Sequence, residues 1–465
     1  MSDPYSRLFA RYAAGVDAVS LPEATVHEVR RRILDSVGVA AAAFDADPPA
    51  AARRYAAARP GAPGATLWGT SQRADPEAAG FANGVAVRYL DFNDTYLSLE
   101  PLHPSDVIAP LLALAEARTM APRELMAGIA VAYEIGVGLC DAGSLRAHGW
   151  DHVNYIAVGV AAGAGRMLGL DAARIEHAIS IATVPHAAMR QTRAGELSMW
   201  KGAAAANASR NALTGALLAE AGMTGPFHPF DGEMGFIVQL LGGEAFRDAP
   251  LAAMREGAPP SRILDTYVKC WPVEYHAQSA VDAALQLRGD LGGSLEGVEH
   301  IHIDTFGASY QIIAKDPQKW DPKTRETADH SLQYIVVAAL EDGEVTQETF
   351  DLERIRRPET LRWLQHQVSL DEDPELSAGY PDGIPNRIVV TRADGSQHVR
   401  EIRHPRGHAR NPMTDDELTA KYRANVAGRW TDAKAERVAE LVWSIDAAPT
   451  VDGFVAAMGA AMGAD

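Results

Sequence analysis

Residues 88–106 read RYLDFNDTYLSLEPLHPSD, and the rest of the chain is organised around this stretch. It mixes aspartate, asparagine, glutamate and histidine with aromatic residues, between two alanine-rich segments of helical pattern. Burying carboxylates beside aromatic rings is costly unless they are paired or hydrogen-bonded, so this mixture suits the wall of a pocket. The alternative is a helix end followed by a polar turn that Pro101 and Pro104 close.

The composition predicts a large globular protein. A chain of 465 residues is long for one core, which favours two or three domains, or one large domain with a second inserted. Hydrophobic residues make up 47% and charged residues 22%, as in ordinary folded proteins. The net charge of -18 leaves no obvious basic face, so we expect no nucleic acid and no membrane as partner.

The N-terminus and the cysteines bear on the compartment. Residues 1–7 lack the basic and apolar regions of a secretory signal, and apolar runs such as 156–165 are shorter than the roughly 20 residues that span a bilayer. We therefore expect a cytoplasmic protein. Cys140 and Cys270 are the only cysteines, which predicts no disulfide framework and is too few for a [4Fe-4S] cluster.

Hydrophobic periodicity predicts a mainly α fold. Apolar residues spaced by three or four predict helices at 25–44, 77–90, 106–117, 121–139, 155–168, 172–187, 201–221, 279–286, 331–341 and 415–447. Residues 298–304 alternate as a strand, and Asp394-Gly395 predicts a type I′ hairpin between 386–393 and 396–403. We predict a large all-helical domain built from both chain ends, 1–264 and 406–465, with an inserted smaller α+β domain at 265–405.

Five further blocks share the character of the first stretch. They lie at 145–155, 201–210, 269–283, 329–334 and 405–414. Together with 88–106, and in this order, they closely resemble the MmgE/PrpD family. The resemblance implies the same two-domain fold, a homodimer, and a small-molecule polycarboxylate substrate. Such a substrate needs a locally basic pocket, because the average surface is acidic.

The resemblance also implies a reaction. It points to a cofactor-independent lyase that dehydrates 2-methylcitrate or a related hydroxy-tricarboxylate. This chemistry requires a base, an acid, and fixed positive charge where a carboxylate becomes enediolate-like. Three alternatives stay open: a decarboxylase of the cis-aconitate type, an amino-diacid epimerase, and a non-catalytic polycarboxylate-binding protein.

Site residues follow from matching the blocks. The resemblance places His103, His152 and His276 in the pocket, with His103 or His152 as base and His276 as acid, roles that can be exchanged. It adds Asp91 and Thr95, which would share a helix face if the helix continued to Thr95. The structural alternatives are satisfied core or surface histidines and an aspartate that caps a helix end.

Lysines and one arginine are the candidate substrate-binding cations. The resemblance assigns Lys201 and Lys269 to carboxylate groups, and Lys269 lies at the domain boundary, where small ligands commonly bind. Arg193 is a further available cation, and Tyr334 belongs to the block at 329–334. The alternatives are a solvated lysine in a first helical turn and a residue that only caps or packs a helix.

Two histidine patterns imitate metal sites. His148 and His152 have a ligand spacing on a helix, but Gly149 makes a helix there improbable. His300, His302 and Asp304 would share one face of a strand, which fits the polar face of a half-buried strand. We therefore expect no metal.

Overall fold

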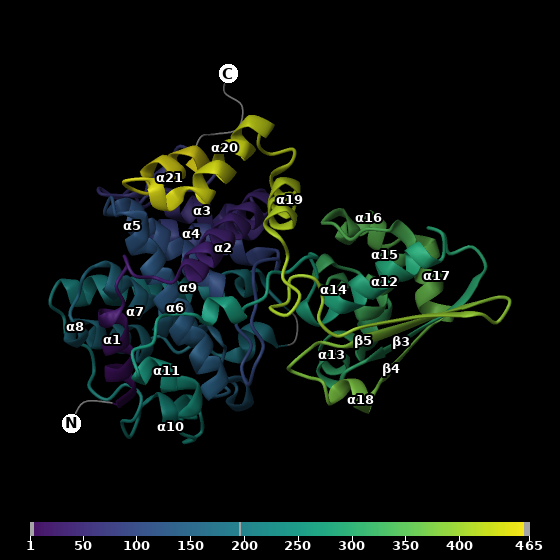
Figure 1. The fold of residues 1–465 in the computed structure, drawn as a ribbon, viewed down its shortest axis with the longest axis horizontal. Helices are drawn as coiled ribbons and strands as arrows, with labels where there is room; N and C mark the ends of the chain where they lie inside the picture. Colours follow the sequence, from purple (N-terminus) through teal and green to yellow (C-terminus); the bar gives the residue numbers. More distant parts are fainter. Residues whose placement is uncertain (1–3, 195–196, 460–465) are drawn as a thin grey trace. The chain divides into compact units, whose positions relative to one another are not determined.

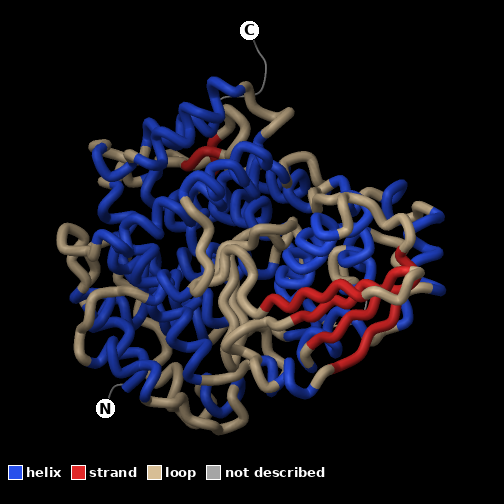
Figure 2. The backbone as a smooth tube through the Cα atoms, turned by 45° about the vertical axis from the view of Figure 1, so that its right-hand side comes forward, coloured by secondary structure: helices blue, strands red, loops and turns tan. Residues whose placement is uncertain are grey.

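The computed structural model describes residues 4–194 and 197–459 and divides the chain into two compact units (Figure 1). Unit 1 comprises Met1–Thr266 and Thr414–Asp465, and unit 2 comprises Tyr267–Met413. The sequence predicts these boundaries at 264/265 and 405/406. Figure 2 shows helices throughout the chain and only a few strands, which confirms the predicted mainly α class.

Unit 1 is built from long helices and several short ones. They are α1 (Pro4–Gly15), α2 (Glu23–Ala42), α3 (Asp47–Ala57), α4 (Pro76–Tyr89), α5 (Ile108–Ala117), α6 (Pro122–Ala142), α7 (Val153–Met167), α8 (Ala172–Thr183), α9 (Ala204–Glu220), α10 (Phe236–Leu240), α11 (Ala252–Arg255), α19 (Asp415–Val426), α20 (Asp432–Trp443) and α21 (Asp452–Gly459). The predicted all-helical character is not complete. The chain reverses within residues 67–72, and the flanking strands β1 (Ala65–Thr66) and β2 (Arg73–Ala74) pair antiparallel.

Helices α6 and α7 form the centre of the unit 1 core. A Cβ atom on Gly159 of α7 would lie 2.6 Å from the carbonyl oxygen of Ala132 in α6, so glycine is required for this close approach. By length and composition α6 could cross a membrane, but 94% of its apolar window is buried inside the protein. The sequence prediction considered uninterrupted apolar runs and therefore did not single out α6.

The first turn and the end of α4 are set by local chemistry. Asp75 caps the helix, because its side chain accepts a hydrogen bond from the Ala78 N–H at 2.8 Å. The helix ends at Tyr89, and Asp91 then takes a left-handed conformation with φ of 51°. This turn directs the chain out of the helix and into the polar stretch.

Unit 2 contains a four-stranded sheet in the order β4-β3-β5-β6. Its elements are β3 (Val298–Thr305), β4 (Val368–Glu372), β5 (Asn386–Arg392), β6 (Gln397–Ile402), α12 (Gln278–Asp290), α13 (Gly307–Ser309), α14 (Arg325–Ala328), α15 (Leu332–Asp342), α16 (Leu352–Ile355), α17 (Pro358–His366) and α18 (Pro374–Ser377). Strand β3 pairs parallel with β4 and antiparallel with β5. Ile301, Ile303, Ile388 and Val390 are buried in the same hydrophobic core as residues of α12 and α15.

The predicted hairpin is present, but the prediction of a type I′ turn is wrong. Gly395 has a φ of 80°, whereas Asp394 is not among the residues with positive φ. Gly395 N–H donates to Arg392 O at 2.9 Å, and Arg392 N–H donates to Ser396 O at 2.9 Å. This is a type I turn followed by a glycine bulge. Asp394 instead accepts the Ser396 N–H at 2.9 Å, a local bond that favours this geometry.

The two ends of unit 2 lie side by side. Val268 N–H donates to Gly407 O at 2.9 Å, and Gly407 has a φ of 93°. Thr414 then starts α19 with a capping box, in which its hydroxyl accepts from Glu417 N–H and the Glu417 carboxylate accepts from Thr414 N–H. The chain therefore returns to unit 1 at a well-defined helix start.

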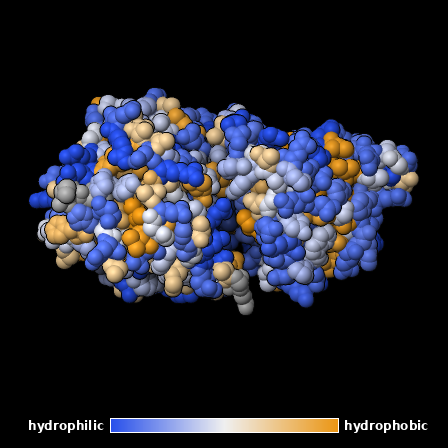
Figure 3. Space-filling view, turned by 90° about the horizontal axis from the view of Figure 1, so that it is seen from below, coloured by the Kyte–Doolittle hydropathy of each residue, from blue (hydrophilic) through white to orange (hydrophobic). Residues whose placement is uncertain are grey.

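On the face drawn in Figure 3, hydrophilic residues cover most of the surface and hydrophobic residues occur in separate small groups. This distribution fits the burial of large apolar side chains inside each unit.

Candidate active site

Asp91 is the centre of a polar cluster in unit 1. Its Oδ1 accepts from Arg88 Nη1 at 2.9 Å and lies 3.6 Å from His103 Nε2, while its Oδ2 is 3.7 Å from Lys201 Nζ. The condition under which Asp91 and Thr95 would share a helix face is not met, because α4 ends at Tyr89. Lys201 lies in a short 3-10 turn at Met199–Gly202, just before α9.

A small backbone hairpin orients the next two residues. Tyr96 and Leu102 exchange backbone hydrogen bonds of 2.8 and 2.9 Å, and Thr95 Oγ1 donates to Leu102 O at 3.1 Å. His103 Nδ1 lies 2.8 Å from the carbonyl oxygen of Asp94. A carbonyl only accepts, so Nδ1 carries the proton in neutral His103 and the basic lone pair is on Nε2, toward Asp91.

His152 faces His103 from the start of α7. The ring centroids are 5.8 Å apart, and His152 Nδ1 is 3.4 Å from Asp151 Oδ1. Arg193 Nε donates to the same Asp151 oxygen at 3.0 Å. Burial, together with the positive charge of Arg193, lowers the pKa of His152 from its ordinary 6.5 to about 3. Its buried Nε2 has no hydrogen-bond partner within 4–194 and 197–459.

The pKa values of two buried carboxyl groups in this cluster, Asp151 and Asp106, are shifted in opposite directions. Burial raises the pKa of Asp151, but His152 and Arg193 outweigh burial and hold it below its ordinary value. Burial raises the pKa of Asp106 to about 7, against the attraction of Arg88. Asp151 is thus held ionised, whereas Asp106 changes charge near neutral pH.

A buried network beneath the cluster escaped the sequence analysis. Asp94 accepts from Ser105 N–H at 2.8 Å and from the Tyr133 hydroxyl at 2.7 Å, and Arg32 Nε is 3.4 Å away. Arg32 occurs in a run of three arginines on an amphipathic helix, and Tyr133 in an apolar helix. Neither position carries a local signal, although the burial of Asp94 in the motif demanded some partner.

Unit 2 holds a second histidine–carboxylate cluster. Glu274 accepts from the backbone N–H of His276, and its other oxygen is 2.8 Å from His276 Nδ1. Burial raises the pKa of Glu274, but His276, His330 and Lys269 together lower it to about 2. Lys269 is 1% exposed, and His276 Nε2 is buried with no partner in the described part of the chain. His276 therefore contacts the Glu274 carboxylate, and the charge of Lys269 acts on the same group.

Tyr334 occupies a different environment from the other predicted residues. It is buried in the core of unit 2, and its hydroxyl donates to Thr349 O at 2.5 Å. In this position Tyr334 packs α15 into the core of unit 2. The proposed site therefore does not include it, and its role in substrate binding stays a prediction.

Two histidine patterns in the sequence imitate metal sites: His148 with His152, and His300 with His302 and Asp304. Gly149 has a φ of 82° and separates His148 from α7, so His148 and His152 share no helix. His300 Nε2 and His302 Nδ1 contact Ser369 Oγ at 2.8 and 2.7 Å, and His302 Nε2 contacts Asp304 at 3.0 Å. Among residues 4–194 and 197–459, no group of three or more His, Cys, Asp or Glu is placed to hold a metal ion.

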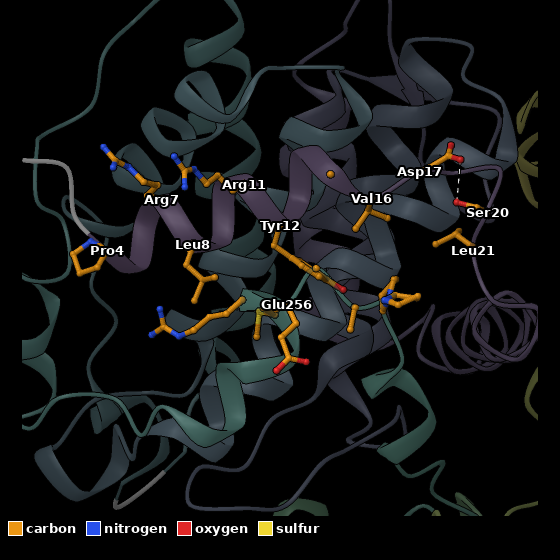
Figure 4. A pocket seen from close by; sticks show the side chains of 17 residues that line it. Pro4, Arg7, Leu8, Arg11, Tyr12, Val16, Asp17, Ser20, Leu21 and Glu256 are labelled. Carbon is orange, nitrogen blue, oxygen red and sulfur yellow. Dashed lines mark hydrogen bonds between the residues drawn. The ribbon is translucent and has the colours of Figure 1, made fainter.

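A cavity of about 570 Å³ lies against α1. Figure 4 shows Arg7 and Arg11 on one side of this helix and Glu256 on the other, with Leu8 and Tyr12 between them. None of the residues predicted for the site lines this cavity, and its charged rim is exposed. We assign no ligand to it.

The fold and these clusters define a class: a mainly helical protein of two units whose histidines, carboxylates and lysines suit acid–base chemistry on an anion. The MmgE/PrpD N-terminal domain matches residues 7–249, and the MmgE/PrpD C-terminal domain matches residues 271–447. The chain therefore belongs to the MmgE/PrpD family, which confirms the resemblance of its six blocks.

Curated relatives cover most of the chain. The 2-methylcitrate dehydratase of Cupriavidus necator is 32% identical over 416 residues, which is 83% of this chain and 82% of that protein. The 2-methylcitrate dehydratase of Escherichia coli strain K12 is 29% identical over 402 residues, 81% of each chain. An alkylcitrate dehydratase of Talaromyces stipitatus is 27% identical over 404 residues, 81% of this chain and 80% of that protein.

Proposed function

We propose that the protein is a dehydratase that removes water from 2-methylcitrate or a related hydroxy-tricarboxylate by general acid–base chemistry, with side chains alone. The observation that supports this most directly is the unit 1 cluster, in which His103 Nε2 lies beside Asp91 and the His103 ring is 5.8 Å from His152. A neutral imidazole is a suitable base for a proton on the carbon next to a carboxylate.

The proposed reaction balances without a cofactor. His103 or His152 takes the proton from the carbon next to a carboxylate, the carbon–oxygen bond one carbon away breaks, and an acid protonates the departing hydroxide. The products are a conjugated alkene and water. Lys201 and Arg193 supply positive charge where the carboxylate becomes enediolate-like, and Asp91 with Thr95 orients the substrate.

The roles of the unit 2 cluster are proposals of the same kind. His276 is the proposed acid, and Lys269 the proposed second cation for a carboxylate. Glu274 holds His276 by its Nδ1 and leaves Nε2 as the atom that can exchange a proton. The roles of base and acid can be exchanged between the histidines. A variant of each histidine must therefore be tested in an assay that measures proton removal separately from loss of water.

The test uses purified, chelator-treated protein with 2-methylcitrate or citrate, followed by the ultraviolet absorbance of the conjugated product. We expect absorbance to rise in the treated protein and to be lost in a His103→Asn variant, which excludes a contaminating enzyme. No signal with either compound rejects the substrate assignment.

The same reaction mixture distinguishes the other activities. NMR in heavy water separates water loss from release of carbon dioxide and from deuterium exchange without net reaction, the outcomes for a dehydratase, a decarboxylase and an epimerase. Calorimetric binding of polycarboxylates without turnover would identify a binding protein. The homodimer stays a prediction, which analytical ultracentrifugation tests.

A further inference from the structure

Glu100 lies inside the stretch 88–106 but has no part in the site so far. It is fully buried, and its backbone N–H donates to Cys140 O in the last turn of α6 at 3.1 Å. Its Oε2 accepts the Arg146 N–H at 2.8 Å and the Ser144 hydroxyl at 3.2 Å. Its Oε1 is buried with no hydrogen-bond partner in 4–194 and 197–459. The carboxyl group therefore binds a loop that is distant in sequence.

That loop, residues 143–152, carries His152 and supports a third segment. Gly149 O accepts from Arg190 N–H at 2.9 Å, and Asp151 N–H donates to Ala188 O at 3.0 Å. The Asp151 side chain in turn holds Arg193. Glu100 thus hydrogen-bonds the stretch with Asp91 and His103 to the loop that carries His152 and holds Arg193 through Asp151.

The surroundings of Glu100 oppose its ionisation. Burial raises its pKa to about 7, although the Arg146 N–H, the charge of Arg146, Ser144 and Arg190 all act in the opposite direction. Cys140 and Tyr155 face the same region, and burial, with the charge of Glu100 as a smaller cause, raises the pKa of each. Ionised Glu100 has an oxygen without a partner in this closed arrangement.

We propose that Glu100 is a pH-dependent latch: a positioning residue that fastens loop 143–152 to the stretch bearing Asp91 and His103, and that releases this loop when it loses its proton. The catalytic part of this inference rests on the proposed function, but the latch itself does not. An open loop exposes Glu100 to water and returns its pKa toward the ordinary 4.5. Opening therefore becomes more favourable as pH rises from about 4.5 to about 7, and is constant above that range.

The first experiment is hydrogen exchange measured by mass spectrometry on the ligand-free full chain, using peptides that cover 144–152 at pH 5.5, 6.5 and 7.5. After correction for the intrinsic exchange rate, we expect the opening constant of the wild type to rise about twentyfold across this range. Glu100→Gln has no proton to lose and keeps an acceptor oxygen, so its opening constant stays flat. Glu100→Ala loses the acceptor and is open at every pH.

Glu116→Gln is the matched control. Glu116 is also buried and also accepts a backbone N–H and a hydroxyl, from Thr66 at 2.7 and 2.6 Å, but it lies on α5. This variant should follow the wild type in peptides 144–152. A wild type without pH dependence in these peptides, or a Glu100→Gln variant with the same pH dependence as wild type, overturns the latch. This comparison decides the matter even if Glu100→Ala fails to fold.

The second experiment is kinetic and separates the two proposals. Glu100→Ala should lower kcat for dehydration at least tenfold, whereas Glu100→Gln should match wild type at pH 6 and exceed it at pH 8. If no tricarboxylate is dehydrated, the exchange experiment still tests the latch. If dehydration is found and Glu100→Gln loses activity equally at both pH values, the latch is rejected while the proposed function stands.

Discussion

His103 and His152 face each other with ring centroids 5.8 Å apart, and the Nδ1 atom of each ring lies toward an oxygen of the protein. His103 Nδ1 is bonded to a backbone carbonyl, and His152 Nδ1 is near the carboxylate of Asp151. His103 Nε2 lies 3.6 Å from Asp91 Oδ1, and the proposed proton transfers use the Nε2 atoms of the two rings. Two differently supported imidazoles at one site are what a reaction with successive proton transfers requires.

Replacing either histidine should abolish most of the activity. We expect His103→Asn and His152→Asn each to lower kcat for dehydration by roughly 10²–10⁴-fold, the usual contribution of general acid–base catalysis. The absorbance assay at saturating substrate measures this. His27→Asn is the control, because His27 stacks on Trp443 and its side chain is 39% exposed. Wild-type kcat in either site variant would remove that histidine from the mechanism.

Burial of neutral His152 should make the protein less stable in mild acid. Its pKa is lowered from 6.5 to about 3, so below pH 6.5 the unfolded chain takes up a proton that the folded chain refuses. Because of this group, the free energy of unfolding falls by up to about 1.4 kcal/mol for each pH unit between 6.5 and 3. Urea unfolding at pH 7, 6 and 5 should show a smaller loss in His152→Asn. If the free energy of unfolding changed equally with pH in wild type and His152→Asn, this prediction would be contradicted.

Replacing Arg193 should both weaken substrate binding and raise the pKa of Asp151. Removing a hydrogen bond to a charged group costs about 1.5–3 kcal/mol, so we expect Arg193→Gln to raise KM about tenfold or more. Loss of its positive charge should also raise the pKa of Asp151. Steady-state kinetics separates KM from kcat, and Arg174→Gln, at an exposed position on α8, is the control. An unchanged KM would exclude Arg193 as a substrate-binding cation.

Glu274 should stabilise unit 2 at neutral pH. Its pKa is lowered from 4.5 to about 2, so its stabilisation is complete above 4.5 and is lost as pH falls through 2. The shift corresponds to roughly 3 kcal/mol at pH 7. Glu274→Gln should be less stable by about this amount at pH 7, and the difference from wild type should shrink between pH 4.5 and 2. Chemical denaturation checks this, with tryptophan fluorescence as the signal. A difference that does not change with pH would refute the ion-pair explanation.

Local patterns predicted the helices well because their causes are local. The periodic apolar positions at 25–44 and 77–90 correspond to α2 and α4, each within about two residues at both ends. The hairpin was predictable for the same reason, but its turn type and register were not. Thr391 pairs with Gln397, which a two-residue loop would not allow, and one hydrogen bond of Asp394 selects the observed turn.

The site was predictable only through the family resemblance. Spacing alone suggested a shared helix face for Asp91 and Thr95, which the left-handed conformation of Asp91 prevents. The partners of Asp94, which are Arg32 and Tyr133, come from distant helices and look like ordinary surface and core residues in the sequence. Tertiary contacts of this kind leave no periodic signal.

The hydrogen bond between Val268 and Gly407 has a practical consequence for protein engineering. Since it holds the entry and exit segments of unit 2 next to each other, a flexible glycine–serine linker could replace unit 2 between Thr266 and Thr414. Unit 2 could then be expressed as a detached cassette, closed into a ring or inserted into another host protein, and the remaining chain studied without it.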